Sequence, residues 1–212
     1  MYNQFAKHFA STRAATEIWG TVQKFMDMIE PNSKILDAGC GSGKNMGLRT
    51  DCQYQGIDNS EALVKICQEQ GYFVDIGDIT ELPYDDNVFD ATMCVAVIHH
   101  LDTREQRQKA VKELYRVTKP GGLIMIQVWA HSATKIRPHR FVELSGAGDF
   151  HVKWKNREDN CEYLRFYHMY VENELNEEIA QAMPGVNMKE DGCARHNYYA
   201  ILCKDNEINI LT

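Results

Sequence analysis

The chain has 212 residues, of which 44% are hydrophobic and 25% charged, and its net charge at neutral pH is −7. This length suits one globular domain, and the negative charge argues against a protein that wraps nucleic acid by bulk electrostatic attraction. The first ten residues lack the basic start and apolar run of a secretion signal, and no apolar stretch approaches the roughly 20 residues that cross a bilayer. We therefore expect a cytoplasmic protein, with a nuclear pool left open, and no membrane partner.

Positive charge is concentrated between His131 and Arg157, where six basic residues stand against two acidic ones, a local net charge of +4. A solvated loop would explain this as well as a binding surface. The seven cysteines form no C-x-x-C pair, so we interpret them as reduced thiols, several of them in the core, and we expect no metal site.

Helical and strand-like patterns alternate along the chain. Apolar residues between positions 3 and 29 recur at helical spacing and predict one or two amphipathic helices, which Pro31 ends. A helix over 60–71 has Ser60 as its N-cap, and a helix over 103–118 opens with the capping box Thr103–Gln106. Predicted strands cover 34–39, 54–58, 72–76, 89–97 and 123–130, with a brief helix between the first two and a turn at 119–122 before the fifth. Beyond an irregular segment at 131–170, we expect a helix over 172–183 and strands at 186–190 and 197–204.

Strands that are separated by helices of this length pair in parallel through crossover connections. The predicted fold class is therefore α/β, a doubly wound, mostly parallel sheet of seven strands with helices on both faces. We find no internal repeat and no second domain. In such sheets, ligands bind beyond the carboxyl ends of the strands.

A glycine-rich loop, Asp37-Ala-Gly39-Cys-Gly41-Ser-Gly43-Lys44, directly follows the first predicted strand. Its glycines let the backbone approach a ligand closely. The loop is not an ATP-binding loop, which would need glycine at Ala38 and serine or threonine at Asn45. It is not the dinucleotide fingerprint either, because the last glycine of that motif would fall at Lys44.

Carboxylates end three successive strands and indicate which ligand the loop holds. Asp58 can accept both hydroxyls of a ribose, Asp78 can accept the amine of an adenine with the Ile79 backbone beside the ring, and Asp37 starts the loop with a negative charge. An anionic pocket around an adenosine suits a sulfonium better than a pyrophosphate. Each aspartate alone could be a helix cap or a turn residue, but three at successive strand ends favour a class I (Rossmann-like) methyltransferase that uses S-adenosyl-L-methionine. The expected cofactor-binding residues are Asp37, Gly39, Gly41, Gly43, Asp58, Asn59, Asp78, Ile79 and Val95.

Several motifs together resemble the eukaryotic tRNA methyltransferase 9 family, which includes the methyltransferase domain of the human AlkB-type tRNA hydroxylase. They are YNQFAKHFASTR with Trp19, LDAGCGSGK, GIDNS with LVKIC, VAVIHHL, KPGG, VWA and the R-F-Y-H segment at 165–168. The resemblance covers the chain from Tyr2 to about Lys204. Two features depart from the family: about thirty residues connect VWA to R-F-Y-H, which is short, and the loop has G-S-G-K where G-N-G-K is common.

The resemblance implies a tRNA methyltransferase that makes the methyl ester of 5-carboxymethyluridine at the wobble position of the anticodon. It also implies a small zinc-binding activator subunit as a partner. Within one domain over 1–212, we then expect a helical lid over 1–30, a cofactor-binding half over 31–130, a basic substrate-side insertion over 131–170 and a C-terminal helix with strands over 171–212.

Two histidines, His99 and His100, stand where the fourth predicted strand ends beside the glycine loop. Because adjacent strand positions face opposite sides, we expect His100 to face the substrate and His99 to pack behind the strand. A carboxylate nucleophile is ionised at neutral pH and needs alignment rather than a general base. His100 and Arg13 are the expected catalytic groups, although Arg13 could instead hold the carboxylate of the cofactor.

Basic and aromatic residues after the fifth strand are the expected RNA contacts. Trp129 could stack on an extruded base, or serve equally well as a core or lid aromatic. With Trp129, the expected substrate and RNA residues are Lys135, Arg137, Arg140, Arg165 and His168.

The third predicted strand, Tyr72–Ile76, lies at the sheet edge in the strand order of methyltransferases. It is apolar and contains neither proline nor lysine, so such an edge invites pairing with another chain. We expect the zinc-binding activator to dock there.

Two other functions remain compatible with the fold. A small-molecule methyltransferase that acts on carboxylates, phenols or arsenic would share the cofactor half and differ in the 131–170 segment. The sequence shows no cysteine cluster of the kind that arsenic chemistry would want. A non-catalytic binding protein would have lost cofactor affinity, which the intact Asp37, Asp58 and Asp78 argue against.

Overall fold

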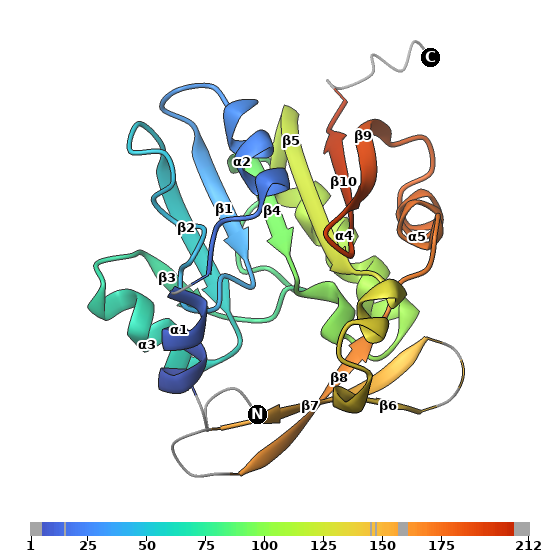
Figure 1. Cartoon of the computed structure of the whole chain (residues 1–212). Helices are drawn as coiled ribbons and strands as arrows, with labels where there is room; N and C mark the ends of the chain where they lie inside the picture. Colours follow the sequence, from blue (N-terminus) through green and yellow to red (C-terminus); the bar gives the residue numbers. More distant parts are fainter. Residues whose placement is uncertain (1–5, 15, 145, 147, 157–160, 206–212) are drawn as a thin grey trace.

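The computed structural model describes residues 6–14, 16–144, 146, 148–156 and 161–205. Its centre is a seven-stranded sheet in the order β3-β2-β1-β4-β5-β10-β9 (Figure 1). The first five strands in this order pair in parallel, and β10 is antiparallel to both of its neighbours. The strands are β1 (Lys34–Ala38), β2 (Gln53–Asp58), β3 (Val74–Ile76), β4 (Phe89–Val95), β5 (Thr118–Trp129), β9 (Asn187–Ala194) and β10 (Asn197–Cys203). The predicted doubly wound, mostly parallel sheet is confirmed.

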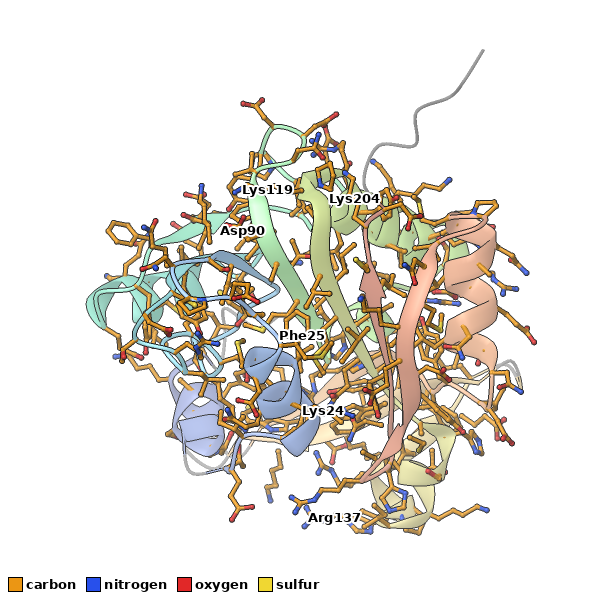
Figure 2. All side chains as sticks on the ribbon, turned by 90° about the horizontal axis from the view of Figure 1, so that it is seen from above. Lys24, Phe25, Asp90, Lys119, Arg137 and Lys204 are labelled. Carbon is orange, nitrogen blue, oxygen red and sulfur yellow. The ribbon has the colours of Figure 1, made fainter. Side chains whose placement is uncertain are left out.

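Helices cover both faces of this sheet. α4 (Arg104–Val117) and α5 (Glu174–Ala182) pack on one face, where Leu114 and Ile179 join the largest apolar cluster. α2 (Gly20–Asp27) covers the other face, and its Phe25, labelled in Figure 2, is fully buried in a cluster with Met93 and Met125. α3 (Glu61–Glu69) lies toward the β2–β3 edge on the same face as α2, since Tyr54 packs against the clusters of both helices. α1 (Ala6–Ala14) precedes them, and no helix among the described residues is long and apolar enough to span a membrane.

Both predicted helix caps form. The Ser60 hydroxyl accepts a hydrogen bond from the Leu63 amide at 3.4 Å, and the Thr103 hydroxyl accepts one from the Gln106 amide at 3.2 Å. Each bond goes to an amide in the first turn of its helix, where no carbonyl four residues earlier lies within the helix.

Two local predictions are wrong. The glycine loop leads into turns rather than a brief helix, because Gly43 and Gly47 both have a φ of +78°, outside the right-handed helical region. The Lys119–Gly122 turn lies inside β5, because Gly121 donates to the carbonyl of Lys204 at 2.7 Å and the Gly122 carbonyl accepts from the Lys204 amide at 2.9 Å.

The segment expected to be irregular forms a second sheet, which corrects that prediction. β6 (Phe141–Glu143), β7 (Asp149–Lys155) and β8 (Glu162–His168) pair antiparallel, after the short 3₁₀ helices η3 (His131–Lys135) and η4 (Pro138–Arg140). One face of this sheet buries Phe150, Val152 and Tyr167 beside Trp129 at the end of β5. The small sheet lies beyond the carboxyl ends of β1 and β4, where Figure 1 shows it closing that end of the molecule.

A buried histidine fastens the small sheet to α5. The His168 ring lies between two carboxylates, with Nδ1 2.7 Å from Asp149 Oδ1 and Nε2 2.7 Å from Glu174 Oε1. Burial alone would lower the pKa of His168, but the hydrogen bonds to Glu174 and Asp149 outweigh it, so the pKa is raised.

This arrangement predicts a stability that depends on pH. A raised histidine pKa contributes stability that is complete below the unfolded value, about 6.5, and is lost as pH rises through the folded value. His168→Gln should lower the free energy of unfolding by about 1.5–3 kcal/mol at pH 6, in line with charge-assisted hydrogen bonds. The difference should shrink by pH 9, as measured by urea unfolding. His139→Gln, on exposed η4, is the control and should change little at either pH; an equal loss for His168→Gln at both pH values would contradict the account.

Candidate active site

The glycine loop is held against the end of β2 by one carboxylate. The Gly41 amide donates to Asp58 Oδ2 at 2.8 Å, and the Ser60 amide donates to Asp58 Oδ1 at 2.9 Å. The amides of Gly39 and Cys40 both donate to the Ile57 carbonyl, at 2.7 and 3.0 Å. Asp58 therefore joins the β1 loop to the start of α3, and burial raises its pKa against these backbone hydrogen bonds.

The first glycine of the loop cannot be replaced without moving its neighbours. Gly39 has a φ of +78°, and a Cβ atom there would lie 2.5 Å from both methyl carbons of Val97. Gly43 has the same φ, but it packs on Tyr72, where a Cβ atom would lie 3.0 Å from the nearest ring carbon. The close packing at Gly39 therefore fits its predicted cofactor role. Gly43 instead packs on Tyr72 behind the loop.

Beyond the loop lies a cavity of about 340 Å³ at the carboxyl ends of the strands. Six of the expected cofactor-binding residues line it: Gly39, Gly41, Asp58, Asn59, Asp78 and Ile79. Asp78 is exposed, and its Oδ1 accepts hydrogen bonds from the amide and hydroxyl of Thr80 at 2.8 Å each. Leu101 and, on β8, Arg165 and Phe166 also line this cavity.

A smaller cavity of about 100 Å³ adjoins the first. The two share Phe9, Gly39, Gly41, Ala96 and His100 in their walls. The smaller one is lined largely by aromatic and basic side chains together with the expected Val95: Trp19, Lys44, His99, Trp129 and Tyr167. The two cavities therefore border each other at these shared residues, and ligands bound in both would lie next to each other.

Asp37 lies beneath the loop and lines neither cavity among the described residues. It is 1% exposed, and its Oδ2 has no hydrogen-bond partner in the described part of the chain. Burial, followed by repulsion from Asp58, raises the pKa of Asp37 to about 7. Two carboxylates that repel each other in this way favour a cationic ligand nearby.

The two histidines do not occupy a strand, so the argument from strand alternation is wrong. β4 ends at Val95, Ala96 takes a φ of +61°, and Ile98–His100 form the 3₁₀ helix η2. The positive φ at Ala96 turns the chain out of the sheet and brings both rings to the cavities.

Their environments differ, although His99 lines the smaller cavity and does not simply pack behind the strand as expected. His99 is 1% exposed, accepts a hydrogen bond from the Trp129 amide at its Nδ1 (3.2 Å) and stacks on the Tyr167 ring with centroids 4.9 Å apart. His100 is half-buried, lines both cavities, and its Nδ1 lies 3.0 Å from the Phe166 carbonyl oxygen. Because a carbonyl oxygen only accepts, Nδ1 of His100 carries the hydrogen.

β8 contributes one group that the sequence predicted and two that it did not. Arg165, expected among the substrate and RNA contacts, is 3% exposed and lines the larger cavity, with its guanidinium carbon 5.1 Å from the Tyr167 ring centroid. Phe166 and Tyr167 were not predicted as site residues. The aromatic residues between 162 and 168 are of the kind that strands favour and could have indicated the strand that delivers them.

The other predicted substrate residues lie outside both cavities as far as the structure describes them. Lys135 and Arg137 are exposed, and Arg137 stands at the margin of the molecule in Figure 2. Arg140 donates from Nε to the Lys153 carbonyl at 3.2 Å, and His168 is held by its two carboxylates. Arg13 lies in α1, but its side chain is outside the described part.

Known proteins agree with the fold. Residues 36–126 match a family model described as a methyltransferase domain. A solved SAM-dependent methyltransferase from Methanosarcina mazei has a TM-score of 0.70 at 18% identity and covers 91% of this chain and 100% of that chain. The complex between the Haloferax volcanii Trm112 methyltransferase activator and a putative methyltransferase gives a TM-score of 0.69 at 14% identity, covering 97% and 98% of the two chains. The predicted class I methyltransferase fold is confirmed.

Sequence relatives show which methyltransferase family the chain belongs to. The tRNA (carboxymethyluridine(34)-5-O)-methyltransferase of Arabidopsis thaliana is 46% identical over 61% of this chain, which spans 32% of that longer protein. The protein of the same name from Schizosaccharomyces pombe is 32% identical over 97% of this chain and 95% of its own length. The chain therefore belongs to the family of tRNA (carboxymethyluridine(34)-5-O)-methyltransferases.

Proposed function

We propose that the chain uses S-adenosyl-L-methionine to convert the carboxylate of 5-carboxymethyluridine, at the wobble position of tRNA, into its methyl ester. The observation that carries this proposal is that the two cavities border each other at Gly39, Gly41 and His100. A methyl donor and an acceptor base must lie next to each other in this way. The names of the relatives support the choice of acceptor.

The larger cavity suits the cofactor. Asp58 uses each carboxylate oxygen for one backbone amide, and each oxygen keeps a second lone pair for a ribose hydroxyl. Asp78 and the buried Ile79 lie on the same wall for the adenine. A cationic ligand against the loop fits the close approach at Gly39 and Oδ2 of Asp37, which has no hydrogen-bond partner among the described residues. The cofactor, when bound, supplies a methyl group on a positively charged sulfur.

The smaller cavity suits the acceptor base. Trp129 and Tyr167 offer aromatic faces with ring centroids 5.1 Å apart, and aromatic faces stack on extruded bases. The acceptor carboxylate is ionised at neutral pH, so the protein's task is to align it. Since Nδ1 of His100 is held by the Phe166 carbonyl, the ring orientation is fixed and its Nε2 can donate to the carboxylate only when the ring is protonated.

The acceptor is tested with anticodon stem-loops. Single-turnover methyl transfer, with the activator present, should proceed with 5-carboxymethyluridine at the wobble position and not with unmodified uridine. His100→Ala should lower the rate tens- to several hundred-fold, about 2–4 kcal/mol of transition-state stabilisation, with cofactor affinity nearly unchanged. His99→Ala should mainly lower the melting temperature.

Equal turnover of the unmodified stem-loop would contradict the carboxylate as the acceptor group. No turnover of either stem-loop would contradict the tRNA substrate and favour a small-molecule methyltransferase. A larger kinetic defect in His99→Ala than in His100→Ala would exchange the roles of the two histidines.

We further propose that a small zinc-binding activator subunit docks on β3. The strand lies at the edge of the sheet, as predicted, although it is shorter than expected, Val74–Ile76. Two apolar side chains beside this edge are strongly exposed, Phe73 at 77% and Ile76 at 58%. The structurally similar Haloferax protein is described in complex with the Trm112 activator, which supports a partner of that kind here.

The docking site is tested by charge substitution. Phe73→Asp should abolish co-purification with the activator, because it puts a carboxylate into an apolar contact without touching the core. Ile136→Asp is the matched control, since Ile136 is likewise apolar and 59% exposed but follows η3 rather than adjoining β3, and it should co-purify normally. Full co-purification of a folded Phe73→Asp protein would place the activator elsewhere.

A further inference from the structure

A two-residue turn joins β9 to β10 at the end of the sheet where β5 finishes (Figure 1). Asn197 pairs with the last residue of β9 and with Trp129, the last residue of β5, so Arg195 and His196 alone form the turn. The Ala130 amide donates to the His196 carbonyl at 3.0 Å. The turn therefore lies directly beside Trp129, which lines the smaller cavity.

The backbone of this turn does not suit an arginine. Arg195 has a φ of +47° and His196 a φ of +62°. A two-residue hairpin turn with two positive φ angles favours asparagine and glycine, because most side chains crowd the backbone in the left-handed region. The Asn197 amide group holds the turn by donating to the Arg195 carbonyl at 2.9 Å. An exposed arginine in an unfavourable conformation points to a function of its side chain.

The Arg195 guanidinium lies close to a second cation at the smaller cavity. Its Nη1 is 3.8 Å from Glu17 Oε2, and Nζ of Lys44 donates to the carbonyl of the same glutamate at 2.7 Å. Lys44 lines the smaller cavity together with Trp129. The pair between Arg195 and Glu17 is long, and its side chains are 75% and 88% exposed, so it is weak and leaves the guanidinium able to bind an anion. Two positive charges therefore border this cavity.

We propose that Arg195 binds a phosphate group next to the wobble nucleotide, an inference that rests on the proposed function. A base in the smaller cavity stays joined to the tRNA backbone on both sides, so its flanking phosphates must pass the residues that surround the cavity. A guanidinium donates two parallel hydrogen bonds to a phosphate. This contact holds the strand in position while Trp129 and Tyr167 stack on the base, and it carries no sequence information.

Arg195→Asn tests the contact, because asparagine suits the turn and carries no charge. Its melting temperature should equal or exceed that of the parent. Fluorescence anisotropy with the 5-carboxymethyluridine stem-loop, with the activator present, should show an affinity lowered about three- to tenfold. The slope of log affinity against log salt should fall by about one. Affinity for S-adenosyl-L-methionine, measured by calorimetry, should stay the same.

Lys189→Gln is the matched control. Lys189 is exposed and lies on the same strand, β9, away from the turn. The substitution changes the net charge by the same amount, so the stem-loop should bind as tightly as it does to the parent.

A modified stem-loop locates the phosphate. One neutral methylphosphonate replaces either the 5′ or the 3′ phosphate of the wobble nucleotide. At one of these two positions, the replacement should weaken binding to the parent as much as Arg195→Asn does, and it should weaken binding to Arg195→Asn little further, since both changes remove the same contact.

Unchanged stem-loop affinity in Arg195→Asn would overturn the proposal, as would losses that add fully at both phosphates. If the parent binds the stem-loop but transfers no methyl group to it, the proposed function fails instead. The coupling between Arg195 and the phosphate is still decided in that case, because it is measured by binding alone.

Discussion

The carboxylate of Asp58 is the interaction on which the rest of the site depends. Its two oxygens accept the amides of Gly41 and Ser60, so one side chain fixes both the glycine loop after β1 and the first turn of α3. The same carboxylate borders the larger cavity. Burying it is costly, as its raised pKa and that of the neighbouring Asp37 indicate. A cationic ligand in that cavity would offset the cost, which links the local geometry to the kind of cofactor that the site binds.

The small antiparallel sheet supplies the part of the cavity lining that the seven-stranded sheet does not provide. β8 brings Arg165 and Phe166 to the larger cavity and Tyr167 to the smaller one. Tyr167 packs on both histidines of η2 and on Trp129, with ring centroids 4.3 to 5.1 Å apart. His168, on the same strand, holds the sheet to α5 through its two carboxylates. The substrate side of the site therefore depends on a sheet that is itself held by a buried histidine between two carboxylates.

Most of the cofactor half could be predicted from the sequence because local patterns determine it: buried strands, two capped helices and aspartates at strand ends. The substrate half could not. The histidines follow Ala96, whose positive φ is unusual for alanine and is imposed by the surrounding fold, so strand alternation was the wrong guide. The run of basic residues hid the alternation of β7, whereas β8 does not alternate between apolar and polar residues. The buried Arg165 resembled a surface cation. The contact of the Cys67 thiol with the Gly41 carbonyl depends on how α3 packs behind the loop, which spacing along the chain does not reveal.

The most direct test of the role of Asp58 is calorimetric titration of the purified chain with S-adenosyl-L-methionine. Asp58→Ala removes the acceptors for two ribose hydroxyls and the anchor of Gly41, so the affinity should fall by more than about tenfold, corresponding to about 1.5–3 kcal/mol. Asp75→Ala, an exposed carboxylate on β3, should bind as the parent does. A folded Asp58→Ala protein with unchanged affinity would contradict the account.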